Sequence, residues 1–195
     1  MPRKKRQLVD AGIYHIYNRG NDRQKLFRED DDFVFFLSRL QIENQPFRAK
    51  VYHYCLMSNH FHLLLEVMAG EHLPILMHRL QLSYARYFKS KYKFIGHLFQ
   101  SRFKSPHIEK ESYYLQCGRY IERNPVKAGL VQEAHRYPWS SASFYTLGRP
   151  NPLLIPNVYY EQLGLTSADR QERYRDFLKL DEPYASAINR ELVSV

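Results

Sequence analysis

The sequence has few residues that could cross-link the chain or hold it in a membrane. Its 195 residues include only two cysteines, Cys55 and Cys117. Two cysteines form no disulfide framework and fit a reducing compartment. Apolar runs are short, as at Leu63–Leu65, whereas a transmembrane helix needs about 20 apolar residues. The basic residues 1–6 are not followed by an apolar segment, so no secretory signal is expected. We therefore expect a soluble, cytoplasmic protein with no membrane partner.

Negative charge is missing from the middle of the chain. The whole sequence has 29 Lys and Arg against 20 Asp and Glu, a formal charge of +9, yet no acid lies between His72 and Ile108. This window interleaves cations with tyrosines and phenylalanines. Cations neutralise phosphates, and aromatic faces stack on unpaired bases. The window therefore favours contact with single-stranded or distorted nucleic acid, the alternative being a solvated surface over core aromatics.

The pattern of apolar residues and turn residues predicts an α+β fold. We expect strands at residues 12–18, 50–56, 60–67 and 103–108, and helices at 30–44, 74–91 and 111–123. The third helix is expected to end before Pro125, because a residue that precedes proline avoids the α region. The order predicts a ferredoxin-like split βαβ sandwich, an antiparallel sheet with helices on one face. Residues 1–10 form a basic arm, 11–132 the main domain and 133–195 a C-terminal helical extension.

His60 and His62 are the first candidates for chemistry. Side chains alternate along a strand, so both imidazoles face one side and Phe61 faces the other. Two imidazoles at this spacing can converge on one metal ion, with a third ligand from elsewhere. The alternative is that they only form hydrogen bonds in a half-buried sheet. We interpret the other histidines, including His15 and His53, as structural.

The third helix carries a tyrosine and an amide one turn apart. Tyr120 and Asn124 have i, i+4 spacing and so share one edge of the helix. This pair could combine a nucleophile with a metal ligand. Alternatively, Tyr120 packs in the interior and Asn124 ends the helix.

Four blocks of residues in a fixed order closely resemble the single-tyrosine transposases that carry the HUH motif, and above all the REP-associated tyrosine transposases. The blocks are residues 14–21, 52–66, 96–105 and 118–130, within a resemblance that spans about residues 10–145. The resemblance implies a nuclease in which His60, His62 and Asn124 bind Mg²⁺ or Mn²⁺ and Tyr120 is the nucleophile. Tyr113, two turns earlier on the same helix, is the alternative nucleophile.

The resemblance also implies a partner and a reaction. Such enzymes cut and rejoin single-stranded DNA beside a hairpin through a 5′-phosphotyrosine. We expect a nucleoid-associated monomer or homodimer. The candidate DNA contacts are Arg3, Lys4, Lys5, Arg6, Arg19, Asn21, Arg86, Lys89, Lys91, Lys93, Arg102 and Lys104. The alternatives are a replication initiator or relaxase with the same chemistry, a hairpin-binding module that does not cut, and a zinc hydrolase that uses Cys55 with the two histidines.

Overall fold

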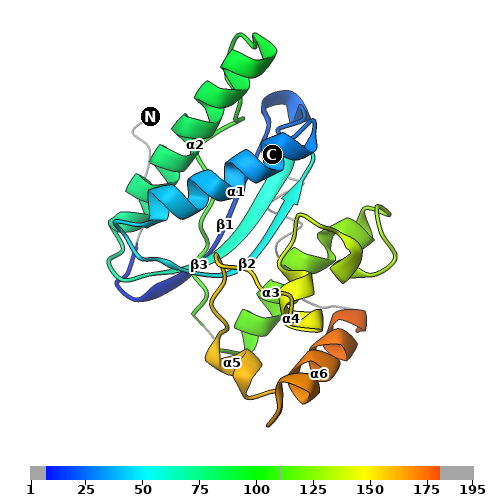
Figure 1. The fold of residues 1–195 in the computed structure, drawn as a ribbon. Helices are drawn as coiled ribbons and strands as arrows, with labels where there is room; N and C mark the ends of the chain where they lie inside the picture. The colour runs from blue at the N-terminus through cyan, green and yellow to red at the C-terminus, as the bar shows by residue number, and fades with distance from the viewer. Residues whose placement is uncertain (1–7, 110, 181–195) are drawn as a thin grey trace.

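A three-stranded antiparallel sheet forms the centre of the molecule (Figure 1). The computed structural model describes residues 8–109 and 111–180. The strands are β1 (Gly12–Arg19), β2 (Lys50–Met57) and β3 (His60–Val67), in the order β1-β3-β2. A tight turn at residues 58–59 joins β2 to β3, as predicted. Strand β3 is therefore the central strand and pairs with both β1 and β2.

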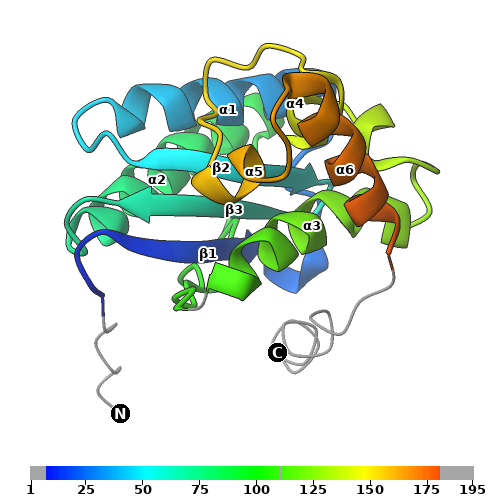
Figure 2. The same ribbon diagram turned by 90° about the horizontal axis from the view of Figure 1, so that it is seen from below.

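Two helices cover one face of this sheet. They are α1 (Asp30–Asn44) and α2 (His72–Tyr92), which lie side by side on the sheet in Figure 2. Apolar residues of α1, including Phe36 and Leu40, pack with Leu76 and Tyr84 of α2 over Phe61 of the sheet in one buried cluster. Helix α1 has the predicted bounds and starts with a capping box between Glu29 and Asp32. This layer is the predicted split βαβ sandwich.

The third helix, α3 (Glu111–Lys127), lies on the opposite face (Figure 2). Its Tyr114, Cys117 and Ile121 form a stripe that packs in one cluster with Cys55 and Leu64 of the sheet. The chain then continues around α3. These later elements are η2 (Ala134–Arg136), α4 (Ala142–Leu147), α5 (Val158–Glu161) and α6 (Ser167–Lys179). The short helix η1 (Asn21–Arg23) follows β1.

The prediction that α3 ends before Pro125 is wrong. The helix continues through the proline to Lys127. A proline inside a helix leaves the carbonyl four residues earlier without its N–H donor, here that of Ile121. The side-chain amide of Asn124 donates to this carbonyl at 3.2 Å and to the carbonyl of Tyr120 at 2.8 Å. Asn124 thus replaces the missing donor and lets α3 continue.

The predicted strand at residues 103–108 is also wrong. The segment runs beside β1 but makes only isolated bridges, Tyr17 with Lys104 and Tyr14 with His107. Pro106 has no N–H to donate, which interrupts a regular ladder. The segment nevertheless covers the outer edge of β1. In the described part of the chain, no helix is both long and apolar enough to cross a membrane.

Candidate active site on the α3 face of the sheet

The two histidines of β3 face α3, as the strand alternation predicted. The ring centroids of His60 and His62 are 5.1 Å apart. Phe61 between them points to the other face and is buried in the α1/α2 cluster. The imidazoles therefore stand next to each other on the side of the sheet where α3 lies.

A third histidine holds the ring of His62. Nε2 of His15 lies 2.9 Å from Nδ1 of His62, and both side chains are fully buried. Nε2 of His62 has no hydrogen-bond partner among the described residues. If the proton of His62 sits on Nδ1 and is donated to His15, the lone pair of His62 Nε2 is free for a ligand. Sequence reasoning assigned His15 a structural role, because the sheet register that brings it to His62 is not visible in the sequence.

The environment keeps these imidazoles neutral. Burial lowers the pKa of His15 to about 3 and holds the pKa of His62 well below its usual value. Burial also lowers the pKa of His60 to about 4, although a hydrogen bond to Asn124 raises it; the charge of Arg19 lowers it further. A neutral imidazole offers a lone pair, which is the form that binds metal ions.

Asn124 brings an oxygen to the histidine pair. Its Nδ2 is occupied by the two backbone carbonyls of α3. Its side chain also forms a hydrogen bond with His60. Because the nitrogen of the amide is already engaged by the backbone, the oxygen is the atom left to face that ring. The amide that lets the helix pass Pro125 is therefore also the amide that faces the histidines.

The ring of Tyr120 lies beside the rings of His62 and His15. Its ring centroid is 5.6 Å from that of His62 and 5.9 Å from that of His15, both edge-on. The side chain is only 2% exposed, and the Nζ atom of Lys127 lies 5.0 Å from the ring centroid. Tyr113, in contrast, is 43% exposed. The structure thus brings together Tyr120, Asn124, His60 and His62, which come from α3 and β3.

The donor atoms of this site fit a divalent cation. Within residues 8–109 and 111–180, no group of three or more His, Cys, Asp or Glu side chains is arranged to hold a metal ion. The set here is two imidazoles and one amide oxygen. Buried polar atoms are nearly always paired, so the unpartnered Nε2 of His62 marks a place for a ligand. Burial raises the pKa of the Cys55 thiol well above its usual value, so without a metal ion this side chain is a buried neutral thiol.

The predicted DNA contacts differ in their surroundings. Arg3, Lys4, Lys5 and Arg6 lie outside the described residues. Arg19 is half-buried at the end of β1, and its side chain donates to Gln100. The side chain of Lys91 forms ion pairs with Glu29 and with the buried Asp32. The exposed members of the set are Asn21, Arg86, Lys89, Lys93, Arg102 and Lys104.

The ion pairs of Lys91 give this residue a role within the fold. Its charge neutralises acids at the start of α1. We therefore expect Lys91 to contribute less to phosphate binding than the exposed cations. The acid-free window at residues 72–108 did not indicate these ion pairs, because the acids that pair with Lys91 lie about 60 residues earlier in the chain.

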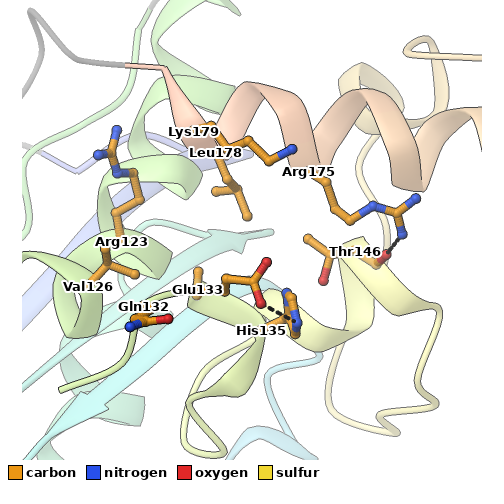
Figure 3. Close-up of a pocket in the computed structure, with 10 residues that line it drawn as sticks. Arg123, Val126, Gln132, Glu133, His135, Thr146, Arg175, Leu178 and Lys179 are labelled. Carbon is orange, nitrogen blue, oxygen red and sulfur yellow. Dashed lines mark hydrogen bonds and ion pairs between the residues drawn. The ribbon is translucent and has the colours of Figure 1, made fainter.

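A separate pocket of about 500 Å³ lies between α3, η2, α4 and α6 (Figure 3). Arg123, Arg175 and Lys179 line it together with Glu133 and His135. Arg175 donates to the carbonyl of Thr146, and His135 pairs with Glu133. None of His60, His62, Tyr120 and Asn124 lines this pocket, so it is not part of the candidate active site.

The sequence matches the profile of the family described as "Transposase IS200 like" over residues 9–124. This match covers more than half of the chain and includes both histidines, Tyr120 and Asn124. The chain belongs to this family. No curated protein matches it.

A solved structure supports the fold of this IS200-like transposase. A structure of a REP-associated tyrosine transposase bound to a REP hairpin superposes with a TM-score of 0.65 at 16% identity, over 81% of this chain and 93% of that chain. A proposed transposase from Deinococcus radiodurans R1 has a TM-score of 0.42 at 20% identity, over 63% of this chain and 97% of that chain. The first similarity shows a shared fold; the second is too weak to carry an argument.

Proposed function

We propose that this IS200-like transposase cuts and rejoins single-stranded DNA next to a hairpin, with Tyr120 as the nucleophile. The observation that carries the proposal is the meeting of Tyr120 and Asn124 with the His60–His62 pair. Membership of the transposase family supports it. The similar fold of a transposase bound to a REP hairpin supports the choice of substrate.

His60, His62 and Asn124 would hold the divalent cation, Mg²⁺ or Mn²⁺. When bound, such a cation polarises a phosphoryl oxygen and orients the scissile phosphate. His15 holds Nδ1 of His62, so Nε2 of His62 would be the atom that binds the cation. Asn124 fixes its own oxygen, because its nitrogen is held by the backbone of α3.

Tyr120 performs the covalent step. Its hydroxyl gives up its proton to water as the oxygen attacks the phosphorus. A bond between that oxygen and phosphorus forms, the bond between phosphorus and the 3′-oxygen breaks, and the 3′-oxygen takes up a proton and leaves as a 3′-hydroxyl. The product is a 5′-phosphotyrosine, which conserves the phosphodiester energy. A second 3′-hydroxyl then reverses the step and joins new ends without nucleotide hydrolysis. The ammonium group of Lys127 beside the ring favours the negative charge that develops on the phenolic oxygen.

The DNA must displace part of the cover over Tyr120, since that side chain is 2% exposed. Lys127, on the last turn of α3, is the group we expect to move toward a phosphate. We propose that exposed cations guide the strand to this point. They are Arg86, Lys89, Lys93, Arg102 and Lys104. The basic residues Arg3, Lys4, Lys5 and Arg6, which lie outside the described residues, complete the set that we propose.

The test uses a labelled single-stranded oligonucleotide that carries a hairpin, with Mg²⁺ or Mn²⁺. We expect a covalent protein–DNA adduct on a denaturing gel, absent in Tyr120→Phe and after chelation. Tyr113→Phe is the matched control, because Tyr113 lies on the same helix but is exposed. It should form the adduct at the normal rate.

Three outcomes would contradict the proposal. An adduct in Tyr120→Phe excludes this nucleophile. Tight hairpin binding without an adduct under either metal indicates a binding module. Equal cleavage of a strand that lacks the hairpin indicates a replication initiator or relaxase.

A further inference from the structure

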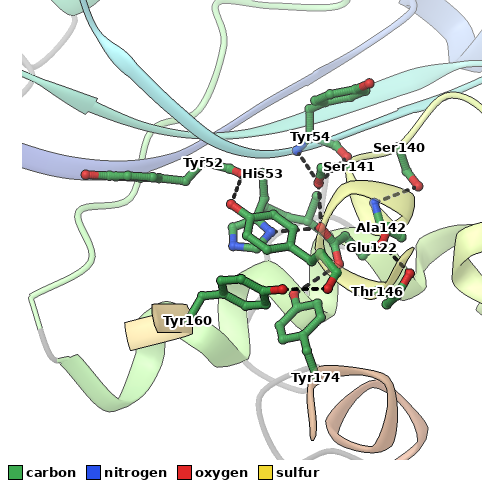
Figure 4. Close-up of polar contacts among 12 residues, drawn as sticks. Tyr52, His53, Tyr54, Glu122, Ser140, Ser141, Ala142, Thr146, Tyr160 and Tyr174 are labelled. Carbon is green, nitrogen blue, oxygen red and sulfur yellow. Dashed lines mark hydrogen bonds and ion pairs between the residues drawn. The ribbon is translucent and has the colours of Figure 1, made fainter. Parts of the chain in front are cut away.

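A buried carboxylate connects α3 to three other parts of the chain. Glu122 is fully buried. It accepts hydrogen bonds from Nδ1 of His53 on β2 at 2.8 Å, from the Oγ atom of Ser141 before α4 at 2.5 Å, and from the hydroxyl of Tyr174 on α6 at 3.0 Å (Figure 4). A buried polar group costs free energy when it is left without hydrogen-bond partners, so each of these contacts matters.

This cluster is not a hydrolytic triad, although it contains serine, histidine and a carboxylate. Ser141 donates to Glu122 and not to His53. In a triad the histidine contacts the nucleophile. Ser141, His53 and Glu122 are all fully buried, which leaves no access for a substrate.

Glu122 lies on the edge of α3 opposite Tyr120 and Asn124. Successive residues of a helix are rotated by about 100°, so residues 120 and 124 share one edge while 118 and 122 share the other. The stripe of Tyr114, Cys117 and Ile121 rests on the sheet between these edges. One edge of the helix therefore faces His62 and the other faces His53.

Besides its hydrogen bonds, the edge of α3 that carries Glu122 is held by close packing against His53. A Cβ atom at Gly118 would lie 2.6 Å from Nε2 of His53, so only glycine lets the helix backbone approach that ring. The ring of Tyr145 stacks on the other side of His53, with centroids 4.4 Å apart. His53 is thus a fixed reference point for α3.

We propose that Glu122, His53 and Tyr174 are positioning residues that set the rotation of α3 about its own axis. They thereby determine where Tyr120 and Asn124 stand relative to His60 and His62. The inference rests on the proposed function, because it assigns to this cluster the alignment of that site. Side-chain tips lie roughly 5 Å from a helix axis, so a rotation of about 10° moves them by about 1 Å. A displacement of about 1 Å can cost about 100-fold in rate.

The proposal gives the C-terminal helices a role in the reaction. Tyr174 belongs to α6, which is also held on α3 by Arg119. That side chain donates to the carbonyl of Phe177 at 3.2 Å and lies 4.6 Å from the centre of its ring. Helix α6 therefore belongs to the unit that aligns the nucleophile.

The test compares two buried tyrosines in the full-length protein. Tyr174→Phe removes the hydroxyl that binds Glu122 and keeps the ring. Tyr160→Phe is the matched control: its ring packs against that of Tyr174, with centroids 5.6 Å apart, but its hydroxyl donates to the carbonyl of Tyr145. Single-turnover adduct formation, the Kd for the hairpin and the Tm are measured for both.

We expect Tyr174→Phe to lower the rate of adduct formation about 10-fold and to leave the hairpin Kd unchanged. Tyr160→Phe should lower the Tm by a similar amount to Tyr174→Phe but keep the rate within about twofold of the wild type. Glu122→Gln should lower the rate at least as much as Tyr174→Phe, and adding Tyr174→Phe to it should cause little further loss, because both act through one network. Equal rate losses in the two tyrosine variants, or none in either, would overturn the proposal.

A second measurement does not depend on cleavage. With 3-fluorotyrosine placed at position 120, the ¹⁹F resonance of the metal-free protein reports the surroundings of that ring. We expect Tyr174→Phe to shift or broaden it and Tyr160→Phe to leave it unchanged; the same spectrum in both variants rejects the positioning role. If the wild-type protein forms no adduct, the proposed function fails while the ¹⁹F comparison still decides this inference.

Discussion

The two faces of the sheet are built from alternating residues of the same strands, yet they have different chemistry. On β3, Phe61, Leu63 and Leu65 face α1 and α2 in an apolar cluster. On the other face, His62 meets His15 beneath α3, and His53 of β2 meets Glu122. Each strand therefore supplies a hydrophobic core to one side and buried polar groups to the other.

The difference between the faces lies in how much each contributes to the stability of the sheet. A buried polar group stabilises the protein little and costs about 1–3 kcal/mol when left unpaired. The apolar face gains stability from every buried side chain, at about 25 cal/mol per Å². The α1/α2 face can thus stabilise the sheet on which the imidazoles and Glu122 are held. A slip of one residue in a strand would exchange the two faces, so the apolar face also fixes the register of the site.

Adjacent residues of β3 give the largest expected contrast between the faces. His62→Ala should reduce adduct formation by more than about 100-fold, because even loss of an outer partner of a metal ligand costs about 10–100-fold. Phe61→Ala should instead lower the free energy of unfolding by about 3–5 kcal/mol. Gel assays and urea denaturation measure the two effects. A loss of stability in His62→Ala as large as that in Phe61→Ala would contradict the separation of roles.

His15 tests whether the polar face is organised for metal binding. His15→Phe removes the acceptor of the His62 ring proton and should weaken Mn²⁺ binding about 10–100-fold. His15→Gln offers an amide oxygen to the same proton and should recover part of the affinity. Free Mn²⁺ is measured by electron paramagnetic resonance. Equal Mn²⁺ affinity in the wild type and both variants would show that His15 serves packing alone.

The pair Asn124 and Pro125 tests how the end of α3 is held. Asn124→Ala should destabilise the protein by about 1 kcal/mol, since it leaves the Ile121 carbonyl without a donor. In a Pro125→Ala background the backbone N–H of residue 125 supplies that donor, and the loss should shrink. Urea denaturation of the four proteins of this cycle measures the coupling. Additive effects would mean that Asn124 does not replace the missing bond.

The smallest expected effects concern the cations around the molecule. Lys104→Ala and Arg102→Ala should each reduce the slope of log K against log salt for hairpin binding by about 1. Lys91→Ala should leave that slope unchanged and lower the Tm, because it leaves the buried Asp32 without its cation. Fluorescence anisotropy at several salt concentrations measures the slopes. A change of slope in Lys91→Ala would return this residue to the DNA surface.

Local patterns in the sequence predict much of the fold and which site residues share a face within one strand or one helix. The periodicity of apolar residues predicts α1 with its observed bounds, and alternation predicts that His60 and His62 share a face. Local rules fail where a side chain or a neighbouring strand intervenes. Asn124 carries α3 past Pro125, and Pro106 prevents residues 103–108 from forming a regular strand.

The sequence by itself determined which residues lie on the same side of each strand and helix, because that depends only on the local repeat of the backbone. It did not indicate that His15 supports His62 or that His53 meets Glu122, although all four residues were visible in it. Only the tertiary structure decided those contacts. They depend on the register of β1 and β2 against β3 and on the rotation of α3 above the sheet, which are set by packing between segments far apart in the chain.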